Sequence, residues 1–280
     1  MSTASQERQM ALWNGDAGHA WVEAQEVLDQ MLEPFVAPLV AAADAGPAAK
    51  ILDVGCGTGA TALAIARRLG PAGECTGVDI SAPMIALARE RAERERAPAT
   101  FVVADAETHP FEASRYDAIV SRFGVMFFED SVRAFANLRR AAKGNGALRF
   151  VAWRSPEENP FMTTAERAAA PLLPNIPPRR ADEPGQFAFA DANRVRRILE
   201  ESGWTAIDIR PVDVLCTFPE SALRQYVTRL GPLGRMLDEA DERTRAQVGE
   251  AVRAAFAPYV HGADVRFDAA GWLVAARAPS

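Results

Sequence analysis

The 280-residue chain has little cysteine and no long apolar run. Its three cysteines, Cys56, Cys75 and Cys216, are an odd number and widely spaced, which argues against a disulfide framework. No Cys-x-x-Cys or His-x-x-x-His spacing indicates zinc, so no metal site is expected. No stretch approaches the roughly 20 apolar residues that span a bilayer, and residues 1–10 lack the apolar centre of a signal peptide. These absences predict a cytoplasmic protein with reduced thiols and no membrane span.

Basic charge is also scarce. The chain has 31 Lys and Arg against 37 Asp and Glu, which gives a formal net charge of −6. Proteins that bind nucleic acids or anionic membranes normally present a basic face. The charge balance therefore predicts no nucleic-acid partner, and the hydrophobic share of 49% is ordinary for a globular protein.

What is present in the first half is an alternation of apolar runs with helical patterns. Strands are expected at residues 50–54, 75–80, 100–105, 116–123 and 147–153, with helices at 60–69, 81–97 and 131–143. Parallel strands joined by crossover helices form a doubly wound α/β sheet. Such sheets bind ligands beyond the carboxyl ends of their strands.

The pattern changes after residue 154. Residues 155–184 contain seven prolines, and long irregular inserts are typical of lids or binding loops. A helix at 191–204, a sixth strand at 205–218 bent at Pro211, a helical region at 220–259 and one or two strands at 264–278 follow. We therefore divide the chain into an N-terminal helical lid segment (1–45), a cofactor-binding core (46–154) and a remainder of the sheet with proline-rich and helical cap insertions (155–280).

A glycine-rich motif, DVGCGTG, follows the first expected strand at residues 53–59. Gly55, Gly57 and Ala60 satisfy the G-x-G-x-x-G/A pattern of dinucleotide sites, which alone is a weak signal. The third alternating glycine, Gly59, departs from that pattern. The carboxylate of Asp53 would repel phosphates, whereas it can accept hydrogen bonds from a ligand ammonium group or order the loop.

Acidic residues also follow the second and third expected strands. Asp79 lies 20 residues after Gly59 and can accept hydrogen bonds from both hydroxyls of a ribose. Asp105 can accept a hydrogen bond from the exocyclic amine of adenine. The ribose contact suits a dinucleotide and S-adenosylmethionine (SAM) equally, so it does not separate the two ligands.

Four motifs in this order resemble those of class I SAM-dependent methyltransferases: residues 53–59, Val78-Asp79-Ile80, Ala104-Asp105-Ala106-Glu107 and Tyr116-Asp117-Ala118-Ile119-Val120. The subgroup most resembled contains the small-molecule enzymes related to ubiquinone and menaquinone biosynthesis, and the match covers about residues 50–153. The resemblance implies a Rossmann-like, mainly parallel seven-stranded sheet with an antiparallel last strand. It also implies SAM as cofactor, S-adenosylhomocysteine (SAH) as product, and methyl transfer to an O, N or C nucleophile of a small molecule.

The resemblance further implies where the ligands bind. The cofactor site is expected to comprise Asp53, Gly55, Cys56, Gly57, Gly59, Asp79, Ile80, Met84, Asp105, Ala106, Glu107, Ser121, Arg122 and Phe123. Substrate contacts are expected from Trp13, Trp21, Met126, Trp153 and Arg154. Because the methyl group of SAM is already activated, positioning and exclusion of water can drive the transfer, and the family dictates no catalytic residue.

The segment ALWNGDAGHAW, at residues 11–21, is unusually rich in aromatic residues and glycine. Two interpretations are open: Trp13 and Trp21 cover the edge of the sheet, or they close over the site as a lid. His19 in the same segment is the candidate general base.

Three questions stay open at this stage, one about Arg154 and two about the function of the whole protein. Arg154 binds a substrate carboxylate or phenolate, or it pairs with a surface glutamate at residue 157 or 158. The whole protein could instead be a non-catalytic SAM-binding protein, whose motif loops would look the same. An NAD-linked oxidoreductase is the third alternative, which Gly59 and Asp53 disfavour.

Overall fold

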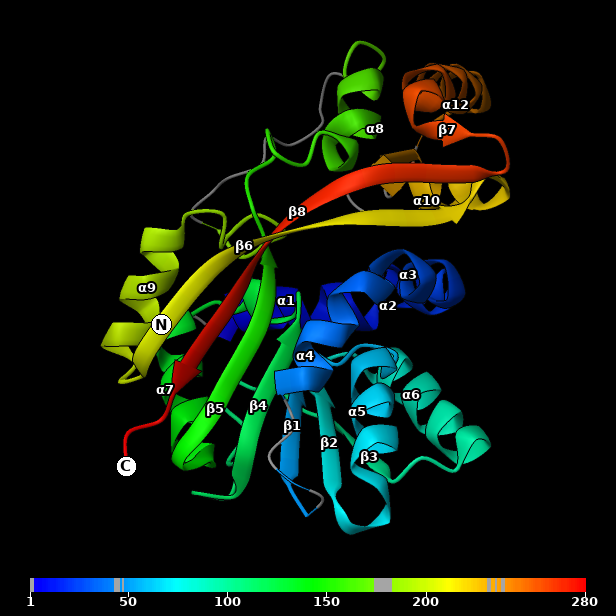
Figure 1. Cartoon of the computed structure of the whole chain (residues 1–280). Coiled ribbons are helices and arrows are strands. Elements are labelled where there is room, and N and C mark those ends of the chain that lie inside the picture. The colour runs from blue at the N-terminus through cyan, green and yellow to red at the C-terminus, as the bar shows by residue number, and fades with distance from the viewer. Residues whose placement is uncertain are drawn as a thin grey trace.

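The structure, a computed structural model, describes residues 3–42, 46, 48–173, 183–230, 233–234, 236–237 and 240–280. Its centre is a mixed sheet with the strand order β3-β2-β1-β4-β5-β8-β6, and β7 pairs with β8 beside this path (Figure 1). The strands are β1 (Lys50–Val54), β2 (Glu74–Asp79), β3 (Ala99–Val103), β4 (Tyr116–Arg122), β5 (Ala142–Trp153), β6 (Thr205–Pro219), β7 (Val260–His261) and β8 (Asp264–Arg277).

Strands β1 to β5 are parallel, and β8 runs antiparallel to both β5 and β6. The predicted Rossmann-like sheet with an antiparallel last strand is therefore confirmed. The described sheet has eight strands rather than the predicted seven, because the chain turns back at Gly262 (φ +67°) and the two residues of β7 pair with the start of β8.

The α-helices are α1 (Thr3–Asn14), α2 (Asp16–Glu23), α3 (Gln25–Leu32), α4 (Val36–Ala42), α5 (Ala60–Leu69), α6 (Ala82–Glu95), α7 (Ser131–Ala141), α8 (Phe161–Ala169), α9 (Ala192–Glu201), α10 (Leu223–Arg229) and α12 (Glu242–Phe256). Short 3₁₀ turns are η1 (Glu33–Phe35), η2 (Gly70–Ala72), η3 (Val125–Phe127), η4 (Glu220–Ala222) and η5 (Ala257–Tyr259). Helix α6 begins after Ser81, whose side chain accepts a hydrogen bond from the Met84 amide as an N-cap.

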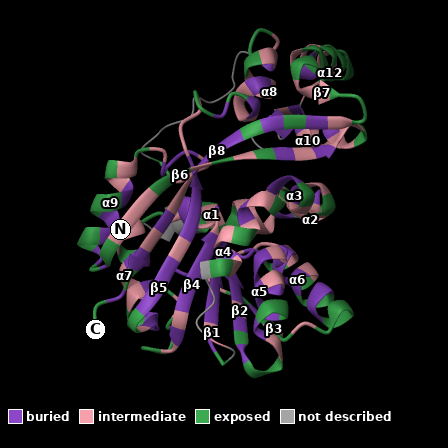
Figure 2. Cartoon of the chain, in the orientation of Figure 1, coloured by how far each residue is buried: buried purple, intermediate pink, exposed green. Residues whose placement is uncertain are grey.

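Both faces of the central sheet are buried, which explains why its strands are continuous apolar runs. On β1, Ile51 joins a hydrophobic cluster with α5 and α6, while Leu52 joins the cluster of the opposite face. Figure 2 shows the central strands buried, whereas buried and exposed residues mix along β6. The core sheet thus forms the rigid platform at whose upper edge the site lies.

Two regions extend beyond this platform (Figure 1). Helices α1 to α4 lie at the carboxyl ends of the central strands, where α2 contacts α6 and α3 contacts β6. Strands β6 and β8 continue as a long two-stranded ribbon, and α8, α10 and α12 gather around its far end. Together these elements cover the edge of the sheet where its loops emerge.

Some boundaries differ from the prediction. Helix α7 ends at Ala141 and not at residue 143, because Ala142 already pairs with Tyr116 as the start of β5. Pro211 pairs with Trp272 in a continuous ladder, and the register irregularity of β6 lies between Thr205 and Asp208, so the expected bend at Pro211 stays a prediction. Of the proline-rich insertion, residues 174–182 lie outside the described residues. Within the described ranges, no helix has both the length and the apolar character to cross a bilayer.

Candidate functional site

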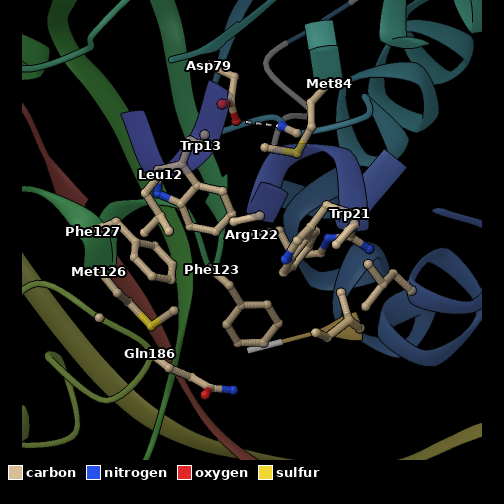
Figure 3. Close-up of a pocket in the computed structure, with 18 of the residues that line it drawn as sticks. Leu12, Trp13, Trp21, Asp79, Met84, Arg122, Phe123, Met126, Phe127 and Gln186 are labelled. Carbon is tan, nitrogen blue, oxygen red and sulfur yellow. Dashed lines mark hydrogen bonds between the residues drawn. The ribbon is translucent and has the colours of Figure 1, made fainter. Parts of the chain in front are cut away.

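A cavity of about 610 Å³ lies beyond the carboxyl ends of β1 to β4, under the N-terminal helices and beside α8, α10 and α12. It is lined by all of the site residues predicted from the sequence except Gly59, Ser121 and Arg154. Figure 3 shows Asp79 and Met84 toward one end of the cavity, Gln186 toward the other, and aromatic side chains between them. The predicted cofactor and substrate residues therefore meet in one continuous space.

The three glycines of the loop after β1 have positive φ angles, but for different reasons. A Cβ at Gly55 would lie 2.6 Å from Cα of Gly124, and one at Gly59 would crowd the ring of Phe101. A Cβ at Gly57 would meet only the Met84 sulfur at 3.8 Å. Protein packing therefore excludes side chains at the first and third glycines, and only Gly57 faces space that a ligand can fill. The prediction that Gly59 contacts the cofactor is not supported by this packing.

Asp79, at the end of β2, shapes the glycine loop. Its Oδ2 accepts a hydrogen bond from the Gly57 amide at 2.8 Å, and its Oδ1 accepts one from the Ser81 amide at 2.9 Å. Burial raises its pKa, while these bonds favour the charged form. Each oxygen keeps acceptor capacity for a ligand, so the expected ribose contact remains a prediction.

Asp53, at the end of β1, is fully buried, and neither oxygen of its carboxylate makes a hydrogen bond of ordinary geometry with a described residue, although the Ala62 backbone at the start of α5 lies close enough to favour the charged form. Its pKa is raised to about 7, chiefly by burial; the nearby positive charge of Arg122 opposes this shift, and the negative charge of Asp79 adds to it. A buried carboxylate without partners is costly unless a charged group pairs with it. Asp53 thus fits the ammonium group of a ligand better than a phosphate.

Two buried arginines surround this corner of the cavity. Arg122, at the end of β4, lies 3.8 Å from Asp29 of α3 and donates to the Leu32 carbonyl at 3.4 Å. Arg91 of α6 donates to Asp29 at 2.6 Å and to the carbonyl of Thr58 at 2.8 Å. Burial lowers the pKa of Arg122, and Asp29 and Asp53 offset this. Asp29 and Arg91 were not predicted, because only the fold brings α3 and α6 together here.

The loops after β3 and β4 hold each other in place. Asp105 accepts hydrogen bonds from the Glu107 amide and the Thr108 hydroxyl. Glu107 in turn accepts from the amides of Glu129 and Asp130, and burial raises its pKa. Ser121 accepts from the Gly124 amide at 3.2 Å instead of lining the cavity, so its predicted cofactor contact is not seen.

Aromatic rings form the wall between the two ends of the cavity (Figure 3). Trp13 packs edge-on against Trp21 and Phe127, with centroid distances of 6.1 and 5.1 Å. Phe123, held at φ +61°, stacks on Trp153 at 3.9 Å. Both tryptophans of the N-terminal segment therefore line the cavity, whereas His19 lies exposed at its rim.

The N-terminal helices are docked on the loop that precedes α6. The Asn14 side chain donates to the Ile80 carbonyl at 3.0 Å and accepts from the Ala82 amide at 2.8 Å. The Ser81 hydroxyl donates to the Trp13 carbonyl at 2.6 Å. Any Cβ at Gly18 would collide with that same carbonyl, so glycine permits the close approach. No local sequence pattern predicted the contacts of Asn14, since an isolated asparagine is usually a turn or surface residue.

The far end of the cavity is lined by side chains from the second half of the chain, between Phe161 and Phe256. Phe161 stacks on Phe267 at 3.7 Å and meets Phe256 and Tyr226 at 5.1 and 5.4 Å. Among the described lining residues the basic side chains are Arg122, Arg229 and His19, while acidic ones are more numerous. This end is therefore apolar and aromatic and lacks a cluster of cations.

The predicted contact of Arg154 with the substrate is not seen. It forms ion pairs with Glu158 and with Asp213, the latter at 2.7 Å, and its guanidinium lies over the Trp272 ring at 5.4 Å. It does not line the cavity. The pairing with a neighbouring glutamate, the alternative to a substrate contact, is what the structure contains.

Comparison with known proteins shows what the sheet-forming first half of the chain is similar to. Residues 51–146 match the family model of a methyltransferase domain. This part of the chain is therefore similar to a methyltransferase domain. The resemblance to class I SAM-dependent methyltransferases, inferred from four sequence motifs, is confirmed.

Relatives of the methyltransferase domain extend this match. The 2-phytyl-1,4-naphtoquinone methyltransferase of Trichormus variabilis is 33% identical over 121 residues, which are 42% of this chain and 53% of that one. The demethylmenaquinone methyltransferase of Thermus thermophilus is 35% identical over 112 residues, 40% of this chain and 50% of that one. The chain thus spans about half the length of these curated relatives.

A solved structure resembles the chain over a greater length. The YcgJ protein of Bacillus subtilis superimposes with a TM-score of 0.58 at 17% identity and covers 89% of this chain and 99% of that protein. The likeness extends well outside the methyltransferase domain and shows a shared fold.

Proposed function

We propose that this protein is an enzyme that transfers a methyl group from SAM to a small, apolar acceptor, leaving SAH. The observation that carries the proposal is the buried, unpartnered carboxylate of Asp53 beside Gly57 within a methyltransferase domain. A ligand ammonium group supplies the positive partner that Asp53 lacks. The pyrophosphate of a dinucleotide would instead bring two further negative charges to a buried anion.

The remaining cofactor contacts follow from the ends of the strands. In this proposal Asp79 binds the ribose hydroxyls and Asp105 the adenine amine, and Ile80, Met84, Ala106 and the Cys56 backbone, which line the same cavity, complete the cofactor contacts. Arg122 is placed for the carboxylate of the amino-acid end. Phe123 and Trp13 line the cavity between its two ends, and aromatic rings there would favour the positive charge of the sulfonium of bound SAM.

The lining of the far end supports an apolar acceptor without a phosphate. Aromatic and aliphatic side chains dominate it, and the described cations are too few to bind a phosphate ester. The names of both curated relatives denote methyl transfer to naphthoquinones, which are apolar ring compounds. We therefore place an aromatic or quinone-like acceptor against Phe161, Met126 and Trp153.

The reaction is a direct displacement. The nucleophilic atom of the acceptor donates its electron pair to the methyl carbon, the carbon–sulfur bond breaks, and its electrons remain on sulfur as the thioether of SAH. The described lid residues exclude water, and the cavity holds the reactants in line. An acceptor that is already ionised needs no general base; for a protonated one, His19 at the rim remains the candidate.

The division of the chain follows this function. Residues 1–45 act as the lid, 46–154 as the SAM-binding core, and 155–280 complete the sheet and cap the acceptor. The docking of Asn14 and Ser81 and the place of Trp13 and Trp21 support the lid. The three cysteines are free and buried, which supports a location in the reducing cytoplasm.

Calorimetric titration with SAM, SAH and NAD tests the ligand class. We expect SAM and SAH to bind and NAD not to bind. A screen with methyl-labelled SAM over quinols, phenols and amines then tests catalysis. Binding of SAM without transfer to any acceptor of these classes would favour a non-catalytic SAM-binding protein, and selective binding of NAD would refute the proposal.

A further inference from the structure

Asp29 of α3 lies between two buried arginines that belong to different parts of the fold. It accepts a hydrogen bond from Arg91 of α6 at 2.6 Å, and its other oxygen lies 3.8 Å from Arg122 of β4. It also accepts a hydrogen bond from Gln25 at 2.6 Å, which fixes its side chain on its own helix. The carboxylate of Asp29 is thus the anchor for both guanidinium groups.

Arg122 has a second carboxylate within reach, that of Asp53. In the parallel pair of β1 and β4, Asp53 is in register with Val120, so Arg122, two residues later, points from the same face of the sheet. Asp53 nevertheless has no hydrogen-bond partner among the described residues. Opposite charges on one face attract each other, and the charge of Arg122 does lower the pKa of Asp53, yet the contacts that Arg122 makes are with Asp29 and the Leu32 carbonyl.

We propose that Asp29 is a positioning residue: it holds Arg122 off Asp53, so that Asp53 stays vacant for the ammonium of SAM and Arg122 for its carboxylate. This inference rests on the proposed function. The amino-acid end of SAM is a zwitterion, and Asp53 and Arg122 then offer it one anion and one cation. Without Asp29, Arg122 would pair with Asp53 and close the subsite.

The same anchor links the lid to the glycine loop. Arg91, held by Asp29, donates to the carbonyl of Thr58, which lies between Gly57 and Gly59. Undocking of α3 would therefore release both Arg91 from the loop and Arg122 from its place. The N-terminal helices are in this way coupled to the amino-acid end of the cofactor.

The charged groups around Asp53 make the pH dependence of SAH binding a second way to test the proposal. They are Arg122 on β4, Asp79 on β2 and the thiol of Cys56, with Asp29, Arg91 and Glu33 around Arg122. In the wild type, the affinity for SAH should rise with pH toward 7 as Asp53 ionises and becomes able to bind the ammonium. In Asp29→Asn this pH dependence should disappear between pH 6 and pH 7, because pairing with Arg122 would lower the pKa of Asp53 and keep it ionised over this range.

The test compares SAH with 5′-methylthioadenosine, which keeps the adenosine and the sulfur but lacks the amino-acid end. We expect Asp29→Asn to weaken SAH about tenfold or more, the effect of losing charged hydrogen bonds, and to leave 5′-methylthioadenosine within about twofold. Glu26→Gln, an exposed carboxylate on the same helix, is the matched control and should change neither affinity. In Asp29→Asn/Arg122→Gln the pH dependence should return, although SAH binding stays weak.

The outcomes separate the two proposals. If Asp29→Asn weakens both nucleosides equally, or if it leaves SAH binding unchanged, the positioning role is wrong while the proposed function stands. If the wild type itself binds neither nucleoside, the proposed function fails, and this inference fails with it. Thermal unfolding of each variant establishes that the protein titrated is folded.

Discussion

The two ends of the cavity are built by different means. The cofactor end consists of short loops at the ends of β1 to β4, where Asp79, Asp105 and Glu107 hold neighbouring backbone amides. The acceptor end consists of aromatic side chains from α8, α10 and α12, which pack on the β6–β8 ribbon through ring contacts such as Phe161 on Phe267. The first end is fixed by backbone hydrogen bonds and the second by packing.

This difference indicates how each end can change. A loop held by backbone amides tolerates little, because Asp79, Asp105 and Glu107 each accept from two donors and Gly55 and Gly59 have no room for side chains. An apolar chamber accepts other residues of similar volume and so can be adapted to another acceptor. We expect mutations at the acceptor end to alter stability and acceptor choice, and mutations at the cofactor end to alter SAM binding.

Phe161→Ala should cause the largest loss of stability, and it should disrupt the packing of the acceptor end without changing the cofactor end. The ring is 1% exposed and has aromatic neighbours on several sides, so its removal should cost about 3–5 kcal/mol of stability. Because it lies away from the glycine loop, SAH affinity should remain within about twofold. Chemical denaturation and calorimetry measure the two quantities.

Phe161→Leu provides the control, since it keeps most of the apolar volume and should lose less stability. A large loss of SAH affinity in a folded Phe161→Ala protein would show that the two ends are not independent.

Gly55→Val should break the cofactor end through the fold itself. A side chain here would meet the Gly124 backbone and would sit at φ +64°, so we expect a loss of about 3 kcal/mol and no SAH binding. Gly70→Ala is the matched control: its φ is +68°, but nothing lies within 4 Å of the added Cβ. Equal destabilisation of the two variants would mean that backbone strain, and not the contact with Gly124, makes Gly55 necessary.

These two ends also differ in how far the sequence predicts them. Asp53, Asp79 and Asp105 each lie at or just beyond the carboxyl end of a strand, so local pattern and the rule that ligands bind at strand ends were enough to single them out. Asp29 and Asn14 depend on contacts with residues more than 60 positions away, Arg91 and Ile80, which no local pattern encodes. Arg154 was misassigned for the same reason, since its partner Asp213 lies on a distant strand.

Asp53→Asn should sharpen the comparison by making the cofactor end insensitive to pH. The folded protein keeps the Asp53 proton up to about pH 7, against 3.8 for the ordinary side chain, so ionisation opposes folding as pH rises between these values. The ammonium of SAH binds the ionised form, and wild-type affinity should therefore increase about fivefold from pH 6 to pH 7. In Asp53→Asn affinity should be weak and nearly constant over this range. A wild-type affinity that is flat, or that falls with rising pH, would exclude Asp53 as the ammonium partner.

Arg154→Ala should have the smallest effect, because Arg154 serves neither end of the cavity. It joins Glu158 and Asp213 at the base of the ribbon, and its guanidinium is partly solvated. Such pairs contribute about 1 kcal/mol or less, and the packing on Trp272 adds a similar amount at most. We expect a small loss of stability with unchanged SAH affinity and an unchanged KM for the acceptor found in the screen. Arg154→Lys, which keeps the charge but not the planar contact with Trp272, should lie between the two proteins in stability. A marked rise in the acceptor KM in either variant would show that Arg154 does contact the acceptor. Because Arg154 does not line the cavity, the ribbon would then have to move when the acceptor binds.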